Sequence, residues 1–235
     1  MKRESLIERL GECPLPIRIQ TSLPLSQKEQ DAIKIRERVG RFILLQEVEQ
    51  TYHMYVYGDK TTGQEHIALI KGLKNGENVP MRIHSSCITA ETFRASNCDC
   101  AEQLQTTLDI IEKEGFGGII RLQQEGRGNG LVGKTRQLKL MIQKGIDTAE
   151  AFREAGYPID QRDYTVAADI LHDLGVESIR LITNNPDKIQ QIKNQGVKVK
   201  ARIPCEVTPS NSIVRKDLIA KRDKLGHFIS EKNTL

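Results

Sequence analysis

The stretch GGIIRLQQEGRGNGLVGKTRQLKLMIQ, residues 117–143, decides the fold. The apolar run at 118–122 is typical of a short buried strand, and the glycine-rich residues 123–130 are typical of a loop. Residues 131–143 then predict a helix. A strand that passes through a loop into a helix is a unit of proteins in which helices cover a sheet.

The same alternation continues along the chain. Leu104, Leu108 and Ile111 share one face of a helix predicted at 102–114, which Gly115 ends. Downstream, the pattern predicts, in order, a helix at 163–174, a strand at 178–183, a helix from Pro186 to about 195 and a strand at 197–203. Alternating strands and helices favour an α/β (α+β) fold.

The first 80 residues have a different character. Residues 40–49 and 53–57 mix β-branched and aromatic residues, with Gly-Asp and Thr-Thr-Gly turns typical of hairpins. The sequence therefore predicts three parts: a strand-rich N-terminal region at 1–80, an α/β core at 81–205, and a basic C-terminal helix and tail at 206–235.

The composition is that of a globular protein: 38% of the 235 residues are hydrophobic and 28% are charged. No apolar stretch approaches the ~20 residues that cross a bilayer, and the N-terminus lacks the apolar core of a signal peptide. We expect a soluble, cytoplasmic protein without a membrane partner.

The charge is concentrated near the C-terminus. Residues 186–235 hold 11 Lys and Arg against 5 Asp and Glu, whereas the whole chain has a net charge of +4. Such a surface suits an anionic small molecule, or it is the solvated face of a terminal helix. The absence of Trp and the 4% of aromatic residues leave little for base stacking, which disfavours a nucleic-acid partner.

Cys87, Cys98 and Cys100 have the spacing C-x10-C-x-C, the strongest chemical signal in the sequence. Asp99 and Glu102 have capping-box spacing, so a helix is expected to begin there and to favour thiolates. Three thiolates leave an open position, as in a catalytic zinc site. The alternatives are a closed site, with Cys205, Cys13 or His84 as fourth ligand, and free thiols packed in a core.

Residues 128–135 match the phosphate-binding pattern G-x-x-x-x-G-K-T. They lie between a predicted strand and a predicted helix, as that pattern requires. However, five residues separate them from the strand, and no later apolar strand ends in an Asp that could hold Mg²⁺. We therefore keep a P-loop NTPase as a disfavoured alternative.

Seven motifs follow one another between Arg82 and Pro204. They are R-x-H-S-x-C at 82–87, C-x-C at 98–100, x-x-Q-L at 101–104, Q-E-G-R-G-x-G-L at 124–131, D-T-x-E-A at 147–151, D-x-R-D-Y at 160–164 and L-x-T-N-N-P-x-K at 181–188. In this order they resemble the GTP cyclohydrolase II family, zinc enzymes that catalyse the first step of riboflavin synthesis. The resemblance covers about half the chain and implies that family's mixed sheet core with helices.

The resemblance implies that the three cysteines hold one Zn²⁺, which activates a water to attack C8 of the guanine ring of GTP. The ring then opens, formate leaves, and pyrophosphate is released with the help of Mg²⁺. Asp160 is the implied proton acceptor and Arg162 the implied nucleophile at the α-phosphate, although a guanidinium is better suited to stabilise phosphoryl charge.

The resemblance also implies a homodimer and a set of nucleotide contacts within the zinc- and nucleotide-binding catalytic core. These contacts are Arg82, His84, Ser85, Gln103, Glu125, Gly126, Arg127, Thr148, Thr183 and Lys188.

Several positions depart from the family pattern. Ser86 stands where the family has Glu, Glu91 where it has Asp, and Leu138 (or Lys139, with one residue of slack) where it has an active-site Tyr. Losing that hydroxyl removes a proton donor or a group that positions water, an effect of about 10²–10⁴-fold.

Three alternatives to complete GTP hydrolysis follow from these departures. The enzyme could stop at a formylated intermediate, or it could act on a uracil nucleotide, as related proteins of pyrimidine catabolism do. A zinc- and nucleotide-binding regulator without turnover is the non-enzymatic alternative. The presence of Asp160, Arg162 and all three cysteines counts against that last reading.

Overall fold

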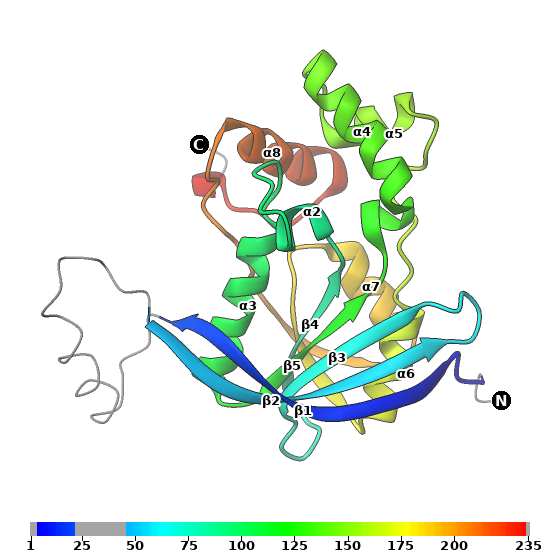
Figure 1. Cartoon of the computed structure of the whole chain (residues 1–235), viewed down its shortest axis with the longest axis vertical. Helices are drawn as coiled ribbons and strands as arrows, with labels where there is room; N and C mark the ends of the chain where they lie inside the picture. Colours follow the sequence, from blue (N-terminus) through cyan, green and yellow to red (C-terminus); the bar gives the residue numbers. More distant parts are fainter. Residues whose placement is uncertain (1–3, 22–45, 234–235) are drawn as a thin grey trace, which may run out of the picture.

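The structure, a computed structural model, describes residues 4–21 and 46–233. Its strands form one seven-stranded mixed sheet in the order β1-β2-β3-β5-β4-β6-β7 (Figure 1). The strands are β1 Ile7–Thr21, β2 Gln46–Asp59, β3 Glu65–Gly72, β4 Val79–Ser85, β5 Gly117–Leu122, β6 Ser178–Ile182 and β7 Lys198–Ile203. Pairing is antiparallel from β1 to β5 and parallel from β5 through β4 and β6 to β7.

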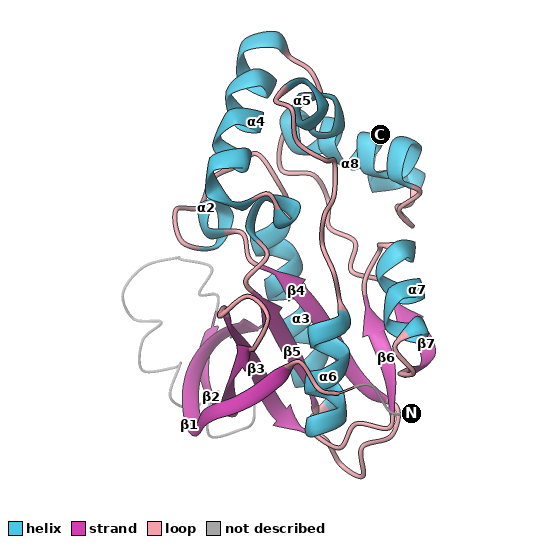
Figure 2. Ribbon diagram, turned by 90° about the vertical axis from the view of Figure 1, so that its right-hand side faces the viewer, coloured by secondary structure: helices cyan, strands magenta, loops and turns pink. Residues whose placement is uncertain are grey.

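Helices lie against the sheet and beyond one of its ends (Figure 2). They are α2 Ile88–Glu91, α3 Cys100–Glu114, α4 Gly130–Lys144, α5 Thr148–Glu154, α6 Thr165–Asp173, α7 Pro186–Asn194 and α8 Ser212–Leu225, with 3₁₀ turns η1 Glu125–Gly128 and η2 Glu231–Asn233. None of the helices in the described ranges has both the length and the apolar character needed to cross a membrane.

Both faces of β5 are buried, which explains why its residues are apolar apart from Arg121. Ile119 packs in a cluster with Ile111 of α3, whereas the next residue, Ile120, packs in the larger cluster with Ile170 of α6. Successive side chains of a strand point to opposite faces, so a strand covered on both sides has no polar face.

The helices and strands predicted in the core are confirmed, with boundaries shifted by one or two residues at most positions. Helix α3 ends at Gly115, which takes a left-handed φ of 76°. At α7, the Asn185 side chain accepts a hydrogen bond from the Asp187 N–H, with Pro186 in the first turn. The C-terminal helix is α8, which Asn211 caps through the N–H groups of Ile213 and Val214.

Three elements of the site are not predicted by the sequence. In strand β4, the polar residues Arg82 and His84 and the residue Pro80 interrupt the apolar pattern expected of a strand, yet every residue before Ser85 is buried. Helices α2 and α5 are short, with four and seven residues.

Strands β1 to β3 continue the sheet of the core, and the division into parts at residues 80 and 205 stays a prediction. Of the N-terminal segments expected to be strands, 53–57 lies within β2. Of the segment 40–49, residues 40–45 lie outside the described residues, and residues 46–49 belong to β2.

We expect Gly117→Ala to lower the free energy of unfolding by about 3 kcal/mol. Gly117 has a φ of 132°, and a Cβ there would lie 2.6 Å from the carbonyl oxygen of Pro80. The matched control is Gly11→Ala in β1, where a Cβ meets nothing within 4 Å, so its expected change is under about 0.5 kcal/mol. Equal losses in urea denaturation of the two variants would contradict this account.

Candidate active site

Three parallel strands end at one pocket. Cys87 lies just beyond β4, Glu125 just beyond β5, and Thr183 directly follows β6, and all three line it. Ligand sites in parallel sheets lie outside the carboxyl ends of the strands, where loops from neighbouring strands meet. This topology brings together motifs that are almost 100 residues apart in the sequence.

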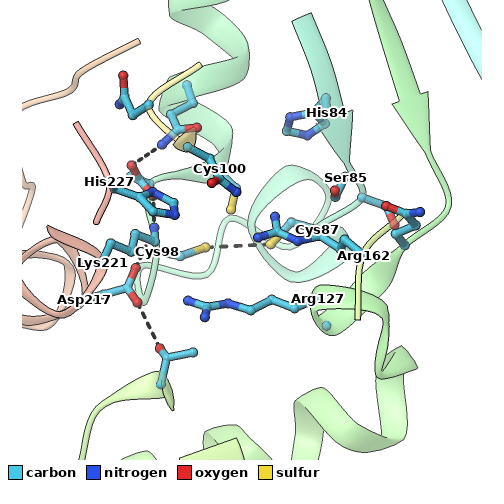
Figure 3. A pocket seen from close by; sticks show the side chains of 18 of the residues that line it. His84, Ser85, Cys87, Cys98, Cys100, Arg127, Arg162, Asp217, Lys221 and His227 are labelled. Carbon is cyan, nitrogen blue, oxygen red and sulfur yellow. Dashed lines mark hydrogen bonds and ion pairs between the residues drawn. The ribbon is translucent and has the colours of Figure 1, made fainter. Parts of the chain in front are cut away.

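The three clustered cysteines come from two turns at this edge. Cys87 precedes α2, and Cys100 is the first residue of α3. The sulfurs of Cys87, Cys98 and Cys100 lie within 4.8 Å of one another, and the first two are 3.7 Å apart (Figure 3). In the described part of the chain, no fourth His, Cys, Asp or Glu completes the group.

Each residue that the sequence offers as a candidate fourth ligand lies in an environment of its own, outside the cysteine cluster. The Cys205 thiol is buried and donates to the Gln103 carbonyl at 3.4 Å. The His84 Nε2 lies 2.7 Å from the Glu91 carboxylate. Cys13 is exposed on β1. The arrangement therefore favours three protein ligands with an open position over a closed four-ligand site.

The electrostatics of the cluster fit a bound cation. Hydrogen bonds from Cys100 and Cys98, and then from Lys134 at 3.1 Å, lower the pKa of the Cys87 thiol. The hydrogen bonds of Cys100 with Cys87 and Cys98, together with burial, raise the pKa of Cys100 well above its usual value. The protein alone thus stabilises one thiolate but not three. Zn²⁺, which prefers thiolate ligands, supplies the missing positive charge.

The predicted start of helix α3 is confirmed, but the predicted capping box is wrong. Asp99 makes no capping hydrogen bond to the N-terminus of α3. Instead its carboxylate is 2% exposed and accepts hydrogen bonds from the Lys221 Nζ at 2.8 Å and from the Gln103 amide. A charged lysine is a stronger partner for a buried carboxylate than a backbone N–H group.

The phosphate-loop alternative is wrong as well. Helix α4 begins at Gly130, so Gly133, Lys134 and Thr135 are helical and cannot wrap a phosphate with their N–H groups. The Thr135 hydroxyl donates to the Leu131 carbonyl, and the Lys134 Nζ lies 2.7 Å from Glu125.

The structure brings nearly all of the sequence-predicted site residues to this pocket. The predicted residues that line it are Arg82, His84, Ser85, Cys87, Cys98, Cys100, Gln103, Glu125, Gly126, Arg127, Thr148, Arg162, Thr183 and Lys188. Asp160 is held by the Arg162 side chain, whose Nε donates to it at 2.8 Å. Burial alone raises the pKa of Asp160, but the hydrogen bonds from Arg162 outweigh it and the net pKa is lowered.

Some lining residues already have partners within the protein. Glu125 accepts from the Ile88 N–H at 2.7 Å as well as from Lys134, so it holds α2 and α4 together. Lys188 donates to the Ile83 carbonyl, and burial followed by the charge of Arg82 lowers its pKa well below the usual value.

Other polar atoms at the pocket are buried without a partner. They are the hydroxyls of Ser85 and Ser86, the Gln124 Oε1 and the Arg127 Nη1. Arg127 has a φ of 56°, in the left-handed region that non-glycine residues rarely adopt. Unpaired buried polar groups gathered around one cavity are the arrangement expected where a polar ligand binds.

Sequence reasoning missed a second set of lining residues. Gln137 lies on α4, Asp217 and Lys221 lie on α8, and His227 lies in the turn that follows. Gln137 is adjacent to Leu138, the position that the motif comparison singled out, and carries no signal of its own. For the other three residues, the only signal in the sequence is the basic composition of the C-terminal segment.

A three-thiol cluster at the edge of a pocket rich in arginine and lysine is consistent with a zinc site in an α/β enzyme and suits an anionic ligand. The family profile described as GTP cyclohydrolase II matches residues 37–204. The chain therefore belongs to the GTP cyclohydrolase II family, as the motifs predict, and its predicted class, a nucleotide cyclohydrolase, is confirmed at the level of the family.

Curated relatives share this match. The chain is 43% identical over 180 residues to riboflavin biosynthesis protein RibBA of Chlorobium phaeovibrioides, covering 76% of this chain and 43% of that one. It is 44% identical over 179 residues to the protein of the same name from Phocaeicola vulgatus, covering 76% and 44%. The chain thus spans less than half the length of these relatives.

Among solved structures, RibBX of A. baumannii, a two domain 3,4-dihydroxy-2-butanone 4-phosphate synthase, is similar over 77% of this chain and 35% of that one. Its TM-score is 0.32 and its identity 16%, and a likeness this low carries no argument about the fold.

We expect Glu91→Gln to weaken zinc binding by about 10- to 100-fold. The Glu91 carboxylate accepts from the Cys87 N–H at 2.8 Å and from the His84 ring, so it orients one thiol and one pocket residue. Zinc retained against a competing chelator measures the effect. Glu102→Gln, an exposed position on α3 with the same change of charge, is the control, and equal affinity in both variants would contradict this role.

Proposed function

We propose that this chain is a zinc-dependent cyclohydrolase that opens the base ring of a nucleotide, with GTP as the substrate, in riboflavin biosynthesis. The observation that carries the proposal is the open three-thiol cluster at the edge of a cationic pocket with unpaired buried polar groups. The matched family and the name of the relatives, riboflavin biosynthesis protein RibBA, support the same reaction.

The metal ligands are Cys87, Cys98 and Cys100. Zinc held by these thiolates would supply an activated water at neutral pH. Lys134, 3.1 Å from the Cys87 sulfur, offsets part of the negative charge of the thiolates. Because Lys134 is buried and paired with Glu125, it acts on the metal ligands rather than on the phosphates.

The phosphates are assigned to Arg127, Arg162 and Lys188, three basic side chains that line the pocket. Guanidinium groups present paired donors that match phosphate oxygens. The Asp160–Arg162 ion pair favours a role for Arg162 in stabilising phosphoryl charge, with Asp160 orienting it, over a nucleophilic arginine with a carboxylate base. Mg²⁺ would enter with the triphosphate.

The base is assigned to the part of the pocket near Ser85, Ser86 and Gln103. The Ser86 hydroxyl is buried without a partner where the family resemblance implies Glu. A pocket that hydrogen-bonds one base strongly rejects bases that lack the matching group. This change keeps a uracil nucleotide as the second candidate substrate. The homodimer and the cytoplasmic location stay predictions.

We expect about one zinc per chain in the purified protein, and both zinc and ring-opening activity lost in Cys100→Ser, because two thiolates form an incomplete site. Metal analysis and mass-spectrometric detection of products from GTP, ATP, UTP and UMP make the measurement. Cys13→Ser, which changes an exposed thiol outside the cluster, should keep both properties. Full turnover by metal-free protein would refute the proposal, and a ring-opened product from UTP or UMP alone would favour the second candidate.

We expect Leu138→Tyr to raise the ratio of formate to pyrophosphate released from GTP. Leu138 is half-buried on α4, next in sequence to the pocket residue Gln137, and it stands at the position where the family pattern has a Tyr. Ile142→Tyr places the same ring at a position of α4 that is 82% exposed and is the control. An unchanged ratio in both variants would show that the missing hydroxyl does not limit deformylation.

A further inference from the structure

One wall of the pocket comes from a segment beyond the family match, which ends at residue 204. Helix α8 contributes Asp217 and Lys221, and His227 follows after the helix ends. Residues four apart lie on the same face of a helix, so Asp217 and Lys221 act as a pair. Figure 3 shows both side chains reaching from α8 toward the cysteine cluster.

Lys221 joins two buried carboxylates. Its Nζ lies 2.8 Å from the Asp99 Oδ1 and 2.7 Å from the Asp217 Oδ2, and the two carboxylates are 2% and 5% exposed. Asp99 stands between the metal ligands Cys98 and Cys100 in the sequence. The lysine therefore ties the turn that carries two of the three thiols to helix α8.

The contacts continue on both sides of Lys221. On one side, the Thr148 hydroxyl at the start of α5 donates to Asp217 at 2.9 Å. On the other, Asp99 accepts from the Gln103 amide, whose oxygen accepts in turn from the Arg82 guanidinium. Thr148, Gln103 and Arg82 all line the pocket. A line of hydrogen-bonded side chains thus connects the nucleotide pocket to the cysteine turn, with Lys221 at its centre.

We propose that Lys221 is a positioning residue for the metal site and acts through Asp99. The proposal rests on the zinc site assigned above. By holding Asp99, Lys221 fixes the backbone between Cys98 and Cys100 and thereby the directions of two thiols. Groups that orient metal ligands in this way are typically required for full affinity.

The burial of the contacts explains why a lysine is needed here. Without it, two carboxylates would face each other in a space with little water, close to three thiolates, and like charges at such distances repel strongly. The repulsion would push Asp99 away from α8 and displace the turn. A positive charge of the right length at 221 is therefore part of the geometry of the site.

The test compares four full-length proteins: wild type, Lys221→Met, Lys221→Arg and Lys216→Met. Methionine keeps most of the volume but neither contact, arginine keeps the charge, and Lys216 is an exposed lysine on the same helix. Zinc affinity is measured by competition with a chelator. The visible absorption of Co²⁺ bound in place of zinc reports the geometry of the thiolates, which a purely structural role elsewhere would leave unchanged. Circular dichroism checks folding.

We expect Lys221→Met to bind zinc about 10- to 100-fold more weakly and to shift the Co²⁺–thiolate absorption, with partial rescue in Lys221→Arg and no change in Lys216→Met. A folded Lys221→Met with wild-type affinity and absorption would overturn the inference. Wild-type protein without zinc would instead refute the proposed function, together with the inference that rests on it.

A second pair of variants separates the path through Asp99 from a loss of folding. In Asp99→Asn the side-chain shape is kept, and the additional loss caused by Lys221→Met is expected to shrink to less than about threefold, because contacting residues are not additive. If the two losses multiply instead, or if Asp99→Asn alone binds zinc like wild type, Lys221 does not act through Asp99. If Lys221→Met alone fails to fold, Asp99→Asn is compared directly with the double variant, which has one fewer unpaired carboxylate, and their zinc affinities should differ by less than about threefold.

Discussion

Three sulfur atoms within 4.8 Å of one another cannot all carry a negative charge unless a cation joins them, and the rest of the site follows from this constraint. The protein stabilises a single thiolate at Cys87 with hydrogen bonds and the Lys134 ammonium. A divalent ion is needed for the other two. Around the cluster, two lysines are matched to nearby carboxylates: Lys134 to Glu125 and Lys221 to Asp99. These pairs limit the net charge while keeping the sulfurs close.

The sheet makes this proximity possible. Because β4, β5 and β6 run parallel, their carboxyl ends share one edge, and the residues after each strand meet there without any long loop. The antiparallel strands β1 to β3 extend the other side of the sheet and contribute none of the residues that line the pocket in the described ranges. The parallel half of the sheet therefore positions the residues of the site, whereas the antiparallel half extends the hydrophobic core.

The sequence predicts those parts of the fold that depend on local physics. Gly115 ends α3 because the left-handed backbone conformation at that position favours glycine. Asn185 and Pro186 start α7, Asn185 by capping and Pro186 in the first turn. Each of these signals lies within a few residues of the helix end that it determines. Strand β4 is not predicted because its Arg82 is buried against distant partners, such as the carbonyl of Ile182, 100 residues further along the chain. The motifs indicate most of the site, whereas the contribution of α8 depends on Lys221 meeting Asp99 across 122 residues. No local pattern contains such a contact.

Lys134 shows why residue spacing without backbone conformation is a weak guide to chemistry. The letters at 128–135 match a phosphate-binding loop, whose function depends on successive N–H groups pointing at one anion. Here Gly133 and Lys134 lie inside α4, where the backbone conformation is helical. The lysine therefore turns toward the Cys87 sulfur and the Glu125 carboxylate instead. The same pattern that would hold a phosphate in a loop serves, in a helix, to stabilise a thiolate.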